Sequence, residues 1–97
     1  MVEQHPVTAL PWYVRADYPT LLRLFSDLDK LPATYDAWLK RAERTESQLQ
    51  KAGFGVARIW IRPVPFAAWC RERNVSPDQT ARLTFVNEAA RCPRAQP

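Results

Sequence analysis

The side chains best suited to nucleophilic or acid–base chemistry are few in this sequence and lie far apart. The one histidine is His5, and the two cysteines are Cys70 and Cys92. Catalysis near neutral pH needs a titratable group held beside a nucleophile or a metal, and no histidine is obviously placed to activate Cys70. A zinc site needs about four ligands at recognisable spacing, which these residues do not supply. The sequence therefore predicts no catalytic residue, no metal site and no cofactor.

Two further features that can mark enzymes have structural explanations here. Asp27 and Asp29 lie in the stretch SDLDKLP, which is typical of a turn, where capping and solvation account for acidic side chains. The two glycines, Gly53 and Gly55, join a helix to a strand and do not form a phosphate-binding loop. The sequence favours a protein that is not an enzyme. A small enzyme with its site at the seam of an oligomer is the alternative.

The stretch VARIWIRP, residues 56–63, carries the most distinctive binding chemistry. Its side chains alternate as in a half-buried strand, and one face presents Arg58, Trp60 and Arg62. Arginine and tryptophan are common anchors for protein and nucleic-acid partners. These three residues are therefore the candidate binding residues. The alternative is that a helix at 34–52 covers Trp60 and makes this face part of the core.

The formal net charge of +4 is concentrated in the second half of the chain. Residues 1–55 carry seven basic and seven acidic residues, whereas residues 56–97 carry seven arginines and three acidic residues. Such a basic segment permits an anionic partner without requiring one. An arginine-rich, solvated surface explains the same counts.

Four helices and one main strand are needed to position these residues. Thr34 and Gly53 are typical residues for the start and end of a long helix, and Asn74 can end a shorter one in a left-handed conformation. Ser76 and Gln79 form a capping box that opens the last helix. The chain is thus predicted to be an α+β protein, mainly helical, with helices near 19–27, 34–52, 65–73 and 77–91 and a strand near 55–62.

The predicted strand raises the question of its hydrogen-bond partner, because an isolated strand leaves a row of donors and acceptors unpaired. Three partners are open: residues 11–16, which could be extended; a loop edge elsewhere in the chain; or the same strand of a second copy. The third choice forms an isologous homodimer around a two-fold axis.

The order strand, helix, helix over residues 56–91 resembles the ribbon–helix–helix DNA-binding fold. The features that carry the resemblance are the alternating VARIWIR, the helix around Phe66–Arg73, the NVSPDQ turn and the final helix. The resemblance implies that two chains pair their strands into a ribbon that enters the major groove. Arg58, Trp60 and Arg62 would then face DNA.

The whole chain also resembles small bacterial proteins of unassigned function, through the Trp69-Cys70 pair and the ARxxF spacing near the C-terminus. This resemblance implies a compact α+β domain and no known activity. A single domain over residues 1–97 is expected, with residues 1–10 and 93–97 flexible. The predicted core comprises Leu21, Phe25, Trp38, Leu49, Ile59, Ile61, Phe66, Trp69, Cys70, Ala81 and Phe85.

The expected setting is the cytoplasm, because the N-terminus has no signal-peptide pattern and both cysteines fit the reduced state. No apolar run approaches the length of a membrane span. The leading functional hypothesis is a non-enzymatic binding or assembly module, homodimeric, with a protein partner possible and no membrane partner. The alternative is a DNA-binding transcriptional regulator that uses Arg58 and Arg62.

Overall fold

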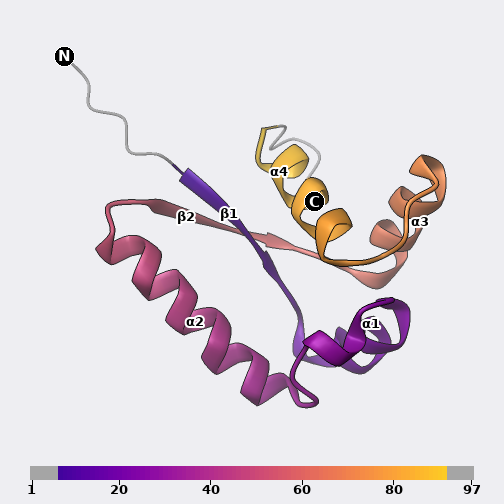
Figure 1. Cartoon of the computed structure of the whole chain (residues 1–97), viewed down its shortest axis with the longest axis horizontal. Helices are drawn as coiled ribbons and strands as arrows, with labels where there is room; N and C mark the ends of the chain where they lie inside the picture. Colours follow the sequence, from indigo (N-terminus) through magenta and orange to yellow (C-terminus); the bar gives the residue numbers. More distant parts are fainter. Residues whose placement is uncertain (1–6, 92–97) are drawn as a thin grey trace.

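The computed structural model describes residues 7–91 and confirms a mainly helical α+β fold (Figure 1). Within that range four α-helices accompany a two-stranded sheet, and two short 3-10 turns precede α1 and α2. The elements in chain order are β1 (Val7–Trp12), η1 (Arg15–Asp17), α1 (Tyr18–Leu24), η2 (Leu28–Lys30), α2 (Tyr35–Lys51), β2 (Gly55–Trp60), α3 (Pro63–Arg73) and α4 (Gln79–Arg91).

The predicted strand finds its partner within the chain. β2 pairs with β1 in parallel, from Val7 beside Gly55 to Trp12 beside Trp60. Residues 7–10, which the sequence predicts to be loose, form most of β1. Of the predicted extended stretch 11–16, only Pro11 and Trp12 belong to the strand. β1 lacks a clear alternating pattern because both of its faces are partly covered, as is usual for parallel strands.

The two strands lie between α2 and α4, so the centre of the molecule has three layers (Figure 1). On one face Trp12 meets Trp38 of α2 edge-on, with ring centroids 5.3 Å apart. On the other face α4 packs on both strands, and Ala9 and Ile59 of the strands are buried there. A parallel pair requires a long crossover connection, which the segment containing α1 and α2 provides.

The helix ends follow the sequence signals with one exception. The Thr34 hydroxyl accepts a hydrogen bond from the Ala37 amide, and Gly53 and Asn74 adopt positive φ values of 97° and 57° after α2 and α3. The predicted cap of the last helix is wrong: α4 begins at Gln79, and Asp78 rather than Ser76 caps it by accepting from the Ala81 amide at 3.0 Å.

The core contains most of the predicted residues and several that were not predicted. Trp69 and Phe85 are half-buried at its rim, and Leu49 is half-buried outside it. The buried residues that the sequence did not reveal are mainly aromatic or small: Ala9, Trp12, Tyr13, Tyr18, Val86 and Ala89.

Candidate functional site

Arg58, the first predicted binding residue, is held against α2. Its Nε and Nη2 donate to the two carboxylate oxygens of Glu46 at 2.8 and 2.7 Å. The guanidinium also lies over the Trp12 ring, 4.0 Å from the centroid. The hydrogen bonds from Arg58 lower the pKa of Glu46, so the pair stays ionised at neutral pH. Arg58 is therefore a partly exposed residue that also links β2 to α2.

Trp60 at the end of β2 and Arg62 just before α3 are exposed like Arg58 but differ from it in their contacts. Trp60 is 45% exposed, so α2 does not cover it and the alternative core placement is wrong. The Arg62 Nε donates to the Asp17 carboxylate at the start of α1. The structure thus leaves the three predicted residues on one exposed strip, with both guanidinium groups paired to carboxylates.

A cleft between α2 and α4, along the outer edge of β1, is more enclosed than this exposed strip. Its volume is about 240 Å³. Buried aromatic rings form its floor, and Tyr13 and Trp38 meet there with centroids 4.7 Å apart. Leu83 of α4 is 41% exposed at the opposite wall. The residues that line the cleft are Leu10, Pro11, Trp12, Tyr13, Leu31, Trp38, Arg41, Ala42, Thr45, Gln79, Arg82 and Leu83.

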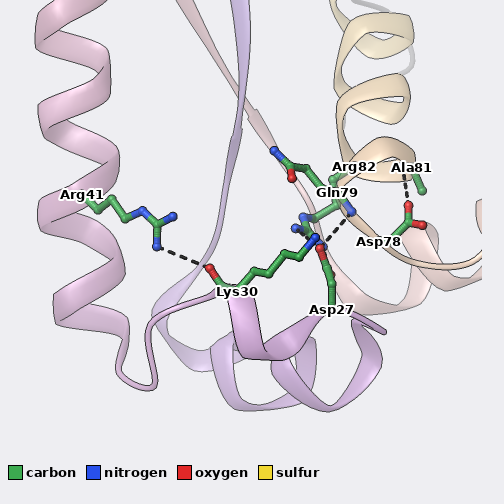
Figure 2. Close-up of polar contacts among 7 residues, drawn as sticks. All are labelled: Asp27, Lys30, Arg41, Asp78, Gln79, Ala81 and Arg82. Carbon is green, nitrogen blue, oxygen red and sulfur yellow. Dashed lines mark hydrogen bonds and ion pairs between the residues drawn. The ribbon is translucent and has the colours of Figure 1, made fainter.

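An ion pair between Asp27 and Arg82 fixes the α4 side of the cleft (Figure 2). Arg82 Nη1 and Nη2 donate to the two oxygens of Asp27 at 2.8 and 3.1 Å, and the Gln79 amide donates to the same carboxylate at 3.1 Å. Both side chains are largely covered, with 6% and 12% of their surface exposed. The hydrogen bonds from Arg82 are the main reason why the pKa of Asp27 lies below its usual value.

One cation that lines the cleft, Arg41, and one that precedes the lining residue Leu31 in sequence, Lys30, have no such partner. Among residues 7–91, Arg41 and Lys30 form no ion pair, and Asp29, which is adjacent to Lys30 in sequence, forms none either. Arg41 reaches from α2 toward η2, where its Nη1 makes a long 3.5 Å contact with the Lys30 carbonyl oxygen (Figure 2). Because Asp27 balances Arg82, the charge that remains at this end of the cleft is positive.

A second hollow, of about 490 Å³, lies beside α3 and α4. Its main polar groups are already engaged. Glu88 accepts from Arg73 Nη1 at 2.6 Å and from the Trp69 indole at 3.3 Å, and Asp78 caps α4. The α2–α4 cleft, whose lining residue Arg41 has no ion-pair partner, is therefore the stronger candidate site.

The surroundings of the other titratable groups indicate a structural role. Cys70 is 4% exposed, and its burial raises the pKa of the thiol. Cys92 and His5 lie outside the described residues. Burial raises the pKa of Tyr13 to about 12, so this floor residue stays protonated and neutral.

In the part of the chain that the structure describes, no group of three or more His, Cys, Asp or Glu residues is arranged to hold a metal ion, and no helix there is long and apolar enough to cross a bilayer.

Sequence reasoning did not find this cleft, because its lining comes from three separate segments. Arg82, the second residue of the ARxxF spacing, is a partial signal of the cleft in the sequence, but nothing in the sequence identifies Asp27 as its partner. A charged residue on the apolar side of a helix usually needs a buried counter-charge, but the sequence does not say which carboxylate supplies it. Comparison of the chain with protein-family models, curated proteins and solved structures finds no match.

Proposed function

We propose that this protein is a non-enzymatic binding module and that the α2–α4 cleft is its ligand site. The observation that carries the proposal is a hollow with an aromatic floor, an exposed leucine, Leu83, at its wall and a lining cation, Arg41, without an ion-pair partner. Small-molecule sites are typically concave and mainly apolar, with a few polar groups that orient the ligand.

The non-catalytic part of the proposal rests on how the carboxylates are used. Asp27, Asp36 and Glu46 all have a pKa lowered mainly by hydrogen bonds from arginines. A general acid working near neutral pH needs the opposite shift. The buried Cys70 thiol, with its raised pKa, is a poor nucleophile. These groups serve to hold the fold together.

The test is to block the cleft without disturbing the rest of α2. Ala42 is half-buried and lines the cleft, whereas Ala37 is exposed on the same helix and does not. A set of small aromatic fragments is screened by amide chemical shifts on the wild type, Ala42→Phe and Ala37→Phe. We expect fragment-dependent shifts at cleft residues in the wild type and Ala37→Phe, and their loss in Ala42→Phe. Shifts that persist unchanged in a folded Ala42→Phe variant would exclude the cleft as the site.

A second candidate function is DNA binding by the strip Arg58, Trp60 and Arg62. What supports it is that all three side chains are exposed, Arg58 and Trp60 on β2 and Arg62 just before α3. Both guanidinium groups would have to exchange Glu46 or Asp17 for phosphate. The test is affinity for duplex DNA over a salt series, with Arg58→Ala/Arg62→Ala as the variant. A DNA binder loses affinity steeply with salt, because neutralised phosphates release counterions. Salt-independent or undetectable binding would exclude this function.

The proposed setting is a homodimer in the cytoplasm. β2 pairs with β1 along one edge only, so the same strand of a second copy could add to the free edge of β2. Light scattering on a size-exclusion column over a range of concentrations measures the solution mass. A monomer at every concentration would exclude both the dimer and a ribbon built from two chains.

A further inference from the structure

We infer that the ligand of the α2–α4 cleft is a small amphipathic anion: an apolar, planar body that carries one carboxylate. This inference rests on the proposed binding function and adds the chemistry of the ligand. It uses three observations that the proposed function leaves open, namely the volume of the cleft, the position of its charges and the edge of β1.

The volume favours a small ligand. A cleft of about 240 Å³ lies just below the usual range for ligand pockets, about 300–1,000 Å³. This volume suits a ligand of about the size of one fused aromatic ring system.

The lining favours a planar apolar body. Leu10, Leu31 and Ala42 are half-buried around the aromatic floor, and Leu83 exposes its side chain at the wall. Removing these groups from water would stabilise an apolar ligand by about 25 cal/mol for each Å² that is buried. The floor rings are already packed against one another, so they offer a preformed surface.

The charges favour one carboxylate. Arg41 is exposed, and the only hydrogen bond that its side chain makes to the described residues is the long one to the Lys30 carbonyl, so its guanidinium retains donors for an incoming anion. Guanidinium and carboxylate groups form paired, charge-assisted hydrogen bonds. Lys30 precedes the lining residue Leu31 but does not itself line the cleft, and Arg82 is occupied by Asp27, so Arg41 is the lining cation available to a ligand. A cationic ligand would meet repulsion here.

The edge of β1 argues against an added peptide strand as the occupant. The Trp12 carbonyl accepts from the Ile61 amide, so it faces β2. Backbone polar groups alternate between the two edges of a strand, which places the Pro11 nitrogen on the outer edge. Proline has no N–H to donate, and this is a common protection of edge strands. A third strand would lose a hydrogen bond at the centre of the cleft.

The experiment compares a charged probe with its neutral counterpart, 1-naphthoate and 1-naphthamide, by calorimetry and amide chemical shifts. The variants are Arg41→Gln and, as matched control, Arg44→Gln, which is exposed on α2 outside the cleft. We expect the wild type to prefer naphthoate, and Arg41→Gln to weaken naphthoate binding about tenfold with naphthamide unchanged. Arg44→Gln should behave as the wild type.

The outcomes separate this inference from the proposed function. Equal affinity for acid and amide, with shifts at cleft residues, would overturn the anion and leave the binding function standing. Failure of both probes and of every fragment to shift cleft residues would overturn both. A β-forming hexapeptide that shifts the Val7 and Ala9 amides, when naphthoate shifts nothing, would overturn the anion in favour of strand addition.

Discussion

The Asp27 carboxylate joins parts of the chain that are distant in sequence. It pairs with Arg82 through two hydrogen bonds and accepts from the Gln79 amide at the start of α4. Arg82 in turn lies over the Phe25 ring, 4.4 Å from its centroid. One acidic residue therefore satisfies a covered cation and an exposed helix terminus at once. Its loss would leave both without a partner.

Replacement of Asp27 by Asn should destabilise the protein by about 3 kcal/mol at pH 7, because it leaves the covered Arg82 charge uncompensated. The pKa of Asp27 is lowered in the folded state, so its stabilisation is present above its ordinary pKa of about 3.9 and is lost as pH falls through the folded value. Urea unfolding over a pH series measures this. The difference between wild type and Asp27→Asn should shrink in acid.

The matched control for Asp27 is Asp36→Asn, which removes an exposed ion pair with Arg15. Solvent screens such a pair, so this variant should change stability far less. Equal losses for the two variants, or a difference that is independent of pH, would contradict the role of Asp27.

The tryptophans give a second prediction at this scale. Trp38 is 6% exposed within the aromatic cluster, whereas Trp60 is 45% exposed. Trp38→Ala should lose about 3–5 kcal/mol of unfolding free energy, and Trp60→Ala about 1 kcal/mol or less. Denaturant titrations of both variants measure the contrast. A large loss for Trp60→Ala would mean that it is buried, for instance by a second copy.

At the scale of elements, two candidate caps at the start of α4, Asp78 and Ser76, can be compared directly. Asp78→Ala should destabilise the protein by about 1 kcal/mol, because it removes the acceptor of the Ala81 amide. Ser76→Ala should have little effect, since Ser76 lies before the helix and offers only its backbone carbonyl, to the Asp78 amide. Thermal unfolding of the two variants, followed by circular dichroism, measures the difference. A larger loss of stability for Ser76→Ala than for Asp78→Ala would show that Ser76 is the cap.

Local signals explain why the helices and β2 could be predicted. Thr34, Gly53 and Asn74 act on their immediate neighbours, so the sequence is enough to place them. β1 could not be predicted, because its hydrogen bonds are made to a distant strand and its pattern is set by cover on both faces. Pro11 also argues against a strand unless its nitrogen faces outward, which is known only from the pairing.

The candidate site also has a part that local sequence patterns predict and a part that depends on contacts between distant segments. The exposure of Arg58, Trp60 and Arg62 follows from alternation along the sequence, and all three residues are exposed in the structure. Their partners Glu46 and Asp17, and the cleft with Arg41, come from packing between segments that no local pattern links.

At the scale of the whole molecule, the fold depends on its N-terminal strand. β1 provides Ala9 and Trp12 to the core and every backbone partner of β2 in the sheet. A chain that starts at Val14 should therefore lose cooperative unfolding. Circular dichroism melts and amide spectra measure this, with a chain that starts at Val7 as control. A sharp transition in the shorter chain would show that β2 and the helices are stable without β1.

The parallel pairing of β1 and β2 also has a consequence for biosynthesis. A ribosome makes β1 well before β2, so the backbone donors and acceptors of β1 have no sheet partner until β2 has left the exit tunnel. Nascent chains that expose an unpaired strand are prone to aggregation and to chaperone binding. The sheet of this protein can therefore form only after β2 has been made.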